Sequence, residues 1–182
     1  MELYAVPYAK VKKKREVREL YHTAFPKEEQ LPFWLLSASA YMRGVELSCY
    51  FDADHLVGFA HVTRYRSIVF VMFFAVSDAV RGMGYGSAIL AHLRAQNEGL
   101  CVVLNVEPLD PSAENYEERE RRMRFYEKNG FYDTGYEIDE VGGTFNVLST
   151  VQTPSMQEYL GVFRRLSFGV WRPRLAPRDG RA

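Results

Sequence analysis

The chain of 182 residues contains little cysteine and no long apolar run. Its two cysteines, Cys49 and Cys101, do not have the spacing of a metal-binding motif and lie in apolar, strand-like segments, so we expect packed thiols rather than a disulfide. No stretch approaches the roughly 20 apolar residues of a membrane-spanning helix, and the first residues lack the apolar segment of a signal peptide. The sequence therefore predicts a cytoplasmic protein with no metal site and no membrane partner.

An excess of charge of one sign is also missing. Lys plus Arg and Asp plus Glu both number 23, so the formal net charge is zero. A nucleic-acid-binding surface requires a basic excess, so we expect no nucleic-acid partner. Residues 10–18 are locally basic, but apolar residues recur beside them at helical spacing. This pattern favours a solvated helix face, with a binding patch as the alternative.

A glycine-rich turn follows an apolar run over residues 68–76 and leads into a helical pattern. Gly82, Gly84 and Gly86 permit backbone angles that other residues avoid, and the amide groups at a helix start attract anions. No Lys-Ser or Lys-Thr follows Gly86, which excludes a P-loop. The glycines also lack the spacing of a dinucleotide-binding loop. The turn therefore indicates a phosphate site of another kind.

A second motif lies roughly 40 residues downstream, where Tyr126 precedes Gly130 in the pattern Phe-Tyr-x-x-x-Gly-Phe. Gly130 is placed to end a helix in the left-handed conformation. Together with the order Arg-x-x-Gly-x-Gly that begins at Arg81, this motif resembles the acetyl-CoA loop and fourth helix of the GNAT superfamily of N-acetyltransferases. The resemblance covers roughly residues 45–150.

The resemblance implies a mixed α/β (α+β) fold with an antiparallel N-terminal meander, a central parallel βαβ crossover and splayed strands. The residue pattern predicts strands over residues 2–6, 45–51, 56–65, 67–76, 100–106, 132–139 and 144–150, and helices over residues 12–25, 28–41, 84–97, 113–129 and 156–168. We expect one acetyltransferase domain over residues 1–150 and a helical extension with a basic tail over 151–182. Residues 172–182 are interpreted as a frayed tail, with packing on a partner subunit in a homodimer, or over the substrate cleft, as the alternative.

The resemblance also implies acetyl-CoA as the cofactor. Backbone amides of the turn would bind the pyrophosphate, and backbone N–H groups at the end of the preceding strand would polarise the thioester. The cofactor-binding residues implied in this way are Phe74, Ala75, Val76, Arg81, Gly82, Met83, Gly84, Tyr85, Gly86 and Ser87.

For catalysis, the resemblance implies that Tyr126 protonates the leaving thiolate of CoA; a core aromatic residue is the alternative interpretation. Histone-type relatives carry a glutamate base where this chain has Phe70, so that base is absent. We expect Glu107 to be the base, with a structural carboxylate or a water chain to solvent as the alternatives. Arg119 stands where many relatives have an asparagine that contacts CoA, and is interpreted as a solvated residue or as charge near the cofactor phosphates.

The predicted function is acetyl transfer from acetyl-CoA to a primary amine of a small molecule or peptide. A non-catalytic acyl-CoA-binding or regulatory module is the alternative, because the histone-type base is missing. Transfer of a longer acyl group is a third possibility. Aromatic and acidic residues near the expected acceptor side suit a cationic, partly apolar amine, although a fold does not fix its acceptor.

Overall fold

The computed structural model describes residues 2–140, 142–167 and 169–178. Parts of three predictions lie outside these residues: Val141 in the last hairpin, Phe168 at the end of the last helix, and 179–182 in the tail. Along the described chain the elements are β1 (Leu3–Pro7), η1 (Tyr8–Lys10), α1 (Lys14–Ala24), η2 (Lys27–Glu29), α2 (Phe33–Ser39), β2 (Val45–Asp52), β3 (His55–Tyr65), β4 (Ile68–Val76), η3 (Asp78–Val80), α3 (Tyr85–Gln96), β5 (Cys101–Val106), α4 (Tyr116–Lys128), β6 (Tyr132–Glu140), β7 (Gly143–Ser149), α5 (Met156–Leu166) and β8 (Arg174–Pro177).

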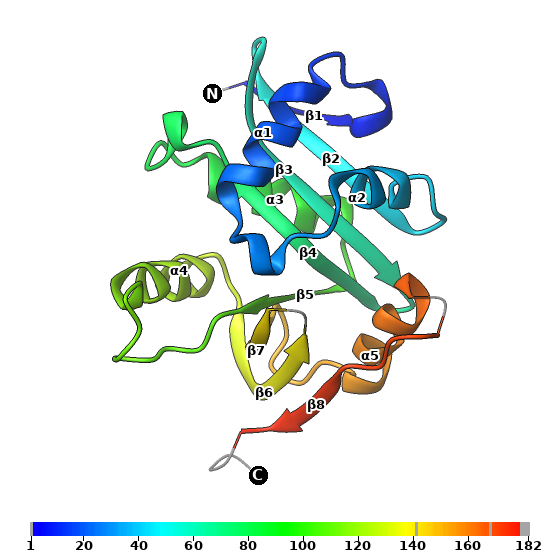
Figure 1. The fold of residues 1–182 in the computed structure, drawn as a ribbon, viewed down its shortest axis with the longest axis vertical. Coiled ribbons are helices and arrows are strands. Elements are labelled where there is room, and N and C mark those ends of the chain that lie inside the picture. Colours follow the sequence, from blue (N-terminus) through cyan, green and yellow to red (C-terminus); the bar gives the residue numbers. More distant parts are fainter. Residues whose placement is uncertain (1, 141, 168, 179–182) are drawn as a thin grey trace. The chain divides into compact units, whose positions relative to one another are not determined.

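The strands form a mixed sheet in the hydrogen-bonded order β1-β2-β3-β4-β5-β7-β6-β8, which confirms the expected fold class (Figure 1). The chain divides into two compact units. Unit 1 contains residues 1–63 and 71–98, and unit 2 contains residues 64–70 and 99–182. Because this division runs through β3 and β4, it does not test the boundary at residue 150, which stays a prediction.

In unit 1, β1, β2 and β3 pair antiparallel, with Cys49 of β2 opposite Phe59 of β3. Neighbouring residues of a strand point to opposite faces of the sheet. Phe59 therefore joins the core under α1 and α2, whereas Gly58 faces α3, where an added Cβ would lie 2.9 Å from the Ile89 side chain. Buried residues from both helices and from β2 to β4 share the first of these faces: Val17, Tyr21, Leu36, Leu47, Cys49, Phe51, Phe59, Phe73 and Ala75.

The helix predicted over residues 28–41 is wrong in its first part. Residues Lys27–Glu29 form a single 3₁₀ turn, and α2 begins only at Phe33. The cause is Pro32, which disfavours helical angles in the residue before it. Gln30 stabilises the break, because its side-chain amide donates a hydrogen bond of 2.7 Å to the Phe25 carbonyl.

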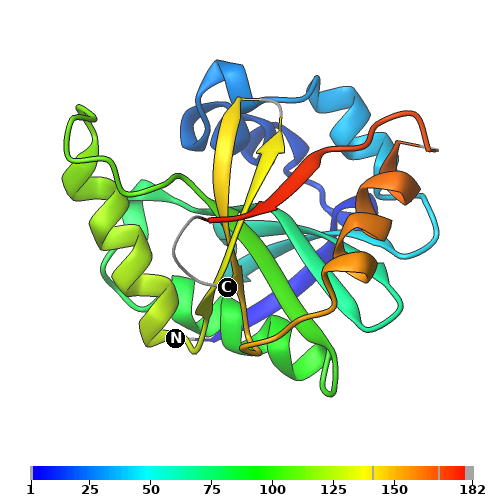
Figure 2. The same ribbon diagram turned by 90° about the horizontal axis from the view of Figure 1, so that it is seen from below.

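In unit 2, the start of β4 lies beside β5, which is followed by β7, β6 and β8. The Cys101 N–H donates to the Ser67 carbonyl at 2.8 Å, so β4 and β5 begin at the same end of the sheet and run parallel, as the βαβ pattern predicts. The pairs β5–β7, β6–β7 and β6–β8 are antiparallel. Helices α4 and α5 lie on opposite sides of these strands (Figure 2).

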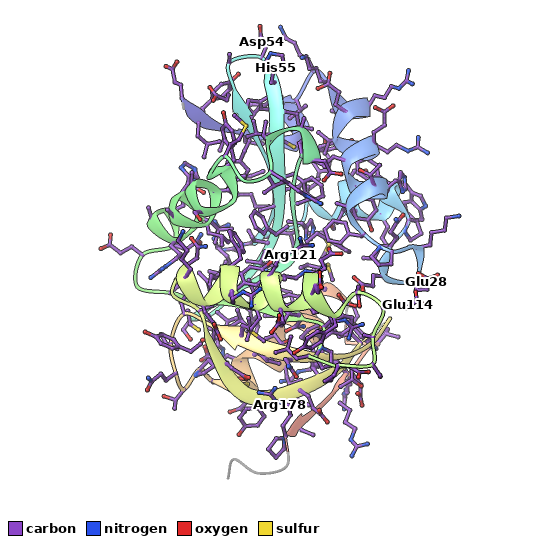
Figure 3. The ribbon with its side chains drawn as sticks, turned by 90° about the vertical axis from the view of Figure 1, so that its left-hand side faces the viewer. Glu28, Asp54, His55, Glu114, Arg121 and Arg178 are labelled. Atoms are coloured by element: carbon purple, nitrogen blue, oxygen red, sulfur yellow. The ribbon has the colours of Figure 1, made fainter. Side chains whose placement is uncertain are left out.

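The predicted frayed tail is wrong for residues 174–177. These residues form β8, which pairs with β6. Arg178 follows the strand (Figure 3). Its N–H donates to the Gly135 carbonyl at 2.8 Å, and its guanidinium pairs with Asp133. Since an uncovered strand edge invites association, β8 protects the outer side of β6.

Helix α5 is part of the core of unit 2. Its Tyr159 and Phe163 are fully buried, and their rings lie 5.6 and 5.1 Å from the ring of Phe70 at the start of β4. The Tyr159 hydroxyl donates a 2.7 Å hydrogen bond to the Asn105 side chain on β5. Residues beyond 150 therefore stabilise the strands that precede them.

Both cysteines are free and buried, which confirms the expected packed thiols, and burial raises the pKa of Cys49 to about 12. Within the described ranges, no helix combines the length and the apolar character needed to cross a membrane. The same residues contain no group of three His, Cys, Asp or Glu side chains that would hold a metal ion.

Candidate active site

The β4–α3 turn, residues 77–84, connects the end of β4 to the first residue of α3. It begins with the 3₁₀ turn η3, and two glycines follow with positive φ, Gly82 at 78° and Gly84 at 87°. A side chain at either position would be strained. Gly84 is also the N-cap of α3, so its left-handed conformation turns the chain directly into the helix.

The start of α3 presents free amide groups. The first hydrogen bond of the helix runs from the Ala88 N–H to the Gly84 carbonyl, at 3.1 Å. The amides of Tyr85, Gly86 and Ser87 precede it and have no acceptor within the helix. Converging amides at the positive end of a helix form a site for a phosphate group.

Arg81 lies in the middle of this turn with most of its side chain in solvent. Its Nε lies 2.8 Å from the Asp78 carboxylate, and the two side chains are 61% and 75% exposed. An ion pair this exposed contributes little to stability. The guanidinium is therefore available to a second anion beside the helix start.

Tyr85 is buried at the first position of α3, and its hydroxyl donates a hydrogen bond to the Asp52 carboxylate at the end of β2. This bond is the main reason why the pKa of Asp52 is lowered and that of Tyr85 is raised. The Glu2 N–H also donates to Asp52, at 3.2 Å. The sequence gives no local signal of the contact between Tyr85 and Asp52, because these residues are 33 positions apart along the chain.

At the end of β4, one edge of the strand pairs with β3. The Ser77 N–H donates to the Val57 carbonyl at 2.9 Å, and the Ala75 carbonyl lies against Gly58 of β3. Successive backbone groups of a strand point to alternate edges. The N–H groups of Phe74 and Val76 therefore point away from β3, as a role in holding a ligand would require.

In unit 2, Tyr126 lies in the last turns of α4 and is 8% exposed. Its ring packs edge-on against Phe125 and Phe131, with centroids 5.2 and 5.6 Å away. Burial raises the pKa of Tyr126 to about 12, and the nearby Arg122 partly opposes this rise. Among the described residues the hydroxyl has no hydrogen-bond partner, so its proton is available to a ligand.

The end of α4 has the predicted glycine cap. Gly130 has a φ of 79°, and its N–H donates to the Glu127 carbonyl at 3.0 Å. The Phe131 N–H then donates to the carbonyl of Tyr126 at 3.1 Å, which completes a Schellman motif. The cap fixes the backbone of the tyrosine itself.

Glu107 lies directly after β5 and binds two arginines of α4. Its Oε1 is 2.9 Å from Arg119 Nη2, and its Oε2 is 2.6 Å from Arg122 Nη1. Asn115 donates a further, longer bond of 3.3 Å. These bonds connect Glu107 to α4, the helix that carries Tyr126. Both oxygens of the Glu107 carboxylate already accept hydrogen bonds from arginine.

Arg119 is not a solvated side chain, which corrects that interpretation. Only 18% of it is exposed, and it donates to the Pro108 carbonyl and to Asn115 as well as to Glu107. Phe70, at the position of the histone-type base, is 2% exposed and packs against α5. No hydrogen-bonding group is present in that side chain.

The part of the chain that holds most of these residues is similar to known proteins. Residues 46–133 match the family model for the acetyltransferase (GNAT) domain. This segment, just under half of the chain, is therefore similar to a GNAT acetyltransferase domain. YjbC of Bacillus subtilis (strain 168), provisionally named as an acetyltransferase, is 31% identical over 109 residues, which are 57% of this chain and 53% of that protein. The chain thus spans about half the length of this curated relative.

Two solved structures show the same fold. A GNAT-family protein of Bacteroides thetaiotaomicron, also provisionally named, superposes with a TM-score of 0.72 at 24% identity, covering 94% of this chain and 100% of that one. An aminoglycoside 6'-N-acetyltransferase complexed with coenzyme A has a TM-score of 0.67 at 17% identity, covering 85% and 99%. At these identities the GNAT likeness concerns the fold alone.

Proposed function

We propose that this GNAT protein transfers an acetyl group from acetyl-CoA to a primary amine of a small molecule or peptide. The observation that carries the proposal is the β4–α3 turn, where positive-φ glycines lead into a helix start with free amides inside the segment that matches the acetyltransferase family. A structural neighbour was solved with coenzyme A, which supports the same cofactor here.

The turn would bind the pyrophosphate of acetyl-CoA. The amides of Gly82 and of residues 84–87 would donate to its oxygens, and Arg81 would add a positive charge. The Met83 N–H, which we also expected to bind the cofactor, already donates to the Val80 carbonyl at 3.3 Å. A single charge at a helix N-terminus contributes about 0.3–1 kcal/mol when exposed. Several charge-assisted bonds together are sufficient for micromolar affinity.

The backbone of residues 74–76 would hold the thioester arm. An N–H group that points away from β3 would donate to the thioester carbonyl, and this bond strengthens as negative charge develops on that oxygen. The amine nitrogen attacks the carbonyl carbon, and the carbon–sulfur bond then breaks. Because only backbone groups act here, apolar side chains are compatible with the role.

Tyr126 would protonate the departing thiolate. With a pKa of about 12, the phenol stays protonated throughout the physiological range and is always in the form of a donor. The proton lost by the attacking amine balances the one that tyrosine donates. Acid catalysis of this kind is worth at least about 100-fold in rate.

The group that deprotonates the amine is Glu107 or a water chain. The two arginines that bind Glu107 compete for the lone pairs that a base needs, which favours a chain of water molecules. In that case Glu107 positions Arg122, one helical turn before Tyr126.

The free, buried cysteines support a reducing compartment such as the cytoplasm. The balanced charge of the chain, with 23 basic and 23 acidic residues, offers no general attraction to nucleic acid. Assembly as a homodimer is part of the proposal.

The proposed function is tested by incubating the protein with acetyl-CoA and a panel of polyamines, aminoglycosides, amino acids and peptides. Released CoA and acetylated product are measured together. We expect slow hydrolysis of acetyl-CoA without an amine and stoichiometric product with the accepted class. Tight binding of acetyl-CoA without turnover on any amine would instead favour the non-catalytic module.

A further inference from the structure

The basic segment near the N-terminus lines a groove in unit 1. The groove lies between α1, α2 and Tyr8 and has a volume of about 500 Å³. Figure 1 shows the two helices side by side in front of β2 to β4. Pockets that bind small molecules commonly span about 300–1,000 Å³. We call this feature the α1–α2 groove.

One wall of the groove is basic. Four lining residues lie on α1: Lys14, Arg15, Arg18 and His22. Positions three and four apart share one side of a helix, so Lys14, Arg18 and His22 form a single row. No lining residue in the described chain is acidic.

The charge of the basic wall is only partly compensated. Arg15 pairs with Glu19, with 2.7 Å between Nε and Oε1. Lys14 places its Nζ 5.1 Å from the centroid of the Tyr8 ring. Within residues 2–140, 142–167 and 169–178, Arg18 has no ion pair. The guanidinium of Arg18, at the centre of the basic wall, is therefore available to an anionic ligand.

The opposite wall is aromatic. Phe33 and Trp34 come from the first turn of α2, and Trp34 is 70% exposed. Phe33 is fixed by an edge-on contact with Tyr8, with 6.0 Å between centroids. A tryptophan face and a guanidinium in one groove suit a ligand that is both planar and negatively charged.

We propose that the α1–α2 groove binds a small organic anion whose carboxylate or phosphate is attached to an aromatic ring. Arg18 and Lys14 bind the anion, and Trp34 and Phe33 contact the ring. No lining residue belongs to the β4–α3 turn or to β4, so the site goes beyond the proposed acetyl transfer and requires no acetyl-CoA.

Calorimetric titration of the full chain with four probes tests the proposal: phenyl phosphate, benzoate, inorganic phosphate and benzyl alcohol. We expect phenyl phosphate, benzoate or both to bind about tenfold more tightly than inorganic phosphate, which lacks the ring, and benzyl alcohol, which lacks the charge. The difference between phenyl phosphate and benzoate shows which anion the groove prefers.

Arg18→Gln should weaken binding of the better probe about tenfold, because it removes one charge-assisted hydrogen bond. Arg18 is exposed, so the substitution leaves the fold intact. Arg121→Gln removes the same charge from an exposed position of α4 (Figure 3) and should leave binding unchanged. The chain has two tryptophans, so in Trp171→Phe the probe should quench the fluorescence of Trp34 alone.

Equal binding of benzyl alcohol and the charged ring compounds would overturn the proposal, as would unchanged affinity in Arg18→Gln. Displacement of the probe by acetyl-CoA would also overturn it, because the groove would then be part of the cofactor site. Probe binding in a protein that transfers no acetyl group would support the proposal and count only against the proposed function.

Discussion

At the scale of single residues, the least obvious contact is the hydrogen bond from Tyr85 to Asp52. It ties the first residue of α3 to the end of β2, and so fixes the helix start whose amides we propose bind the cofactor. The motif Arg-x-x-Gly-x-Gly shows where the glycines must be, but it says nothing about what holds the residue between them. We regard Asp52 as a positioning residue.

Asp52→Ala should raise KM for acetyl-CoA about fivefold, because a hydrogen bond of this kind is worth about 1 kcal/mol. The value of kcat should hardly change, since no reacting atom is touched. Tyr85→Phe should have the same effect, and the double variant should be no worse than either single one. Asp54→Ala, at the exposed tip of the same hairpin, is the control (Figure 3). Additive effects in the double variant would contradict the positioning role.

Glu107→Gln separates the two roles proposed for this carboxylate. If Glu107 only holds Arg119 and Arg122, the variant should lose stability while the pH dependence of kcat/KM keeps its shape. If it is the base, the pH profile itself should change. We expect the first result, measured by steady-state kinetics over a range of pH and by urea unfolding. A changed pH profile of kcat/KM with unaltered stability would instead show that Glu107 is the general base.

At the scale of elements, the packing of α5 depends on the close approach of Gly161 to the Tyr65 ring. A Cβ on Gly161 would lie 2.3 Å from the Tyr65 ring at the end of β3. Alanine is favoured over glycine inside a helix by about 1 kcal/mol, but overpacking against a ring costs more. The absence of a side chain at this position allows α5 to pack against β3.

Gly161→Ala should therefore lower the free energy of unfolding by about 1–3 kcal/mol, measured by urea denaturation. Combining it with Tyr65→Leu should remove much of this cost, since the clashing ring is gone. Gln157→Ala, at an exposed position of the same helix, should have almost no effect. A stabilised Gly161→Ala protein would show that helix propensity outweighs the contact.

Most elements were predictable because local patterns determine them. The strand, glycine turn and helix over residues 68–97 needed only an apolar run, positive-φ glycines and a helical period. The break before α2 was readable from Pro32, but apolar residues on both sides obscured it. Strand β8 was not predictable, because four residues gain their structure only by pairing with β6. The partners of Glu107 and Asp52 were hidden for the same reason: they are distant in sequence.

At the scale of the whole molecule, one buried histidine links stability to pH. His61 lies in β3 and is 1% exposed. Its Nε2 is 2.8 Å from the Ser39 hydroxyl, and its Nδ1 is buried without a hydrogen-bond partner in the described chain. Burial lowers the pKa of His61 to about 4, so the folded protein holds this ring neutral.

The unfolded chain binds a proton at this histidine below about pH 6.5, whereas the folded protein does so only near pH 4. The unfolded state therefore binds more protons in this interval, and stability must fall as the pH falls through it. The contribution is on the order of 3 kcal/mol. In urea unfolding, His61→Gln should lose less stability than the wild type between about pH 7 and 4, while the exposed His55→Gln should behave as the wild type. If stability fell equally with pH in the wild type, His61→Gln and His55→Gln, the role given to His61 would be contradicted.

The central claim of the proposed function is that Tyr126 protonates the thiolate that leaves acetyl-CoA. The most direct test compares Tyr126→Phe with the wild type, using an accepted amine, and measures kcat and the Kd of acetyl-CoA on the same preparations. We predict a kcat lowered about 100-fold with an almost unchanged Kd. Turnover of Tyr126→Phe at the wild-type rate would contradict the claim.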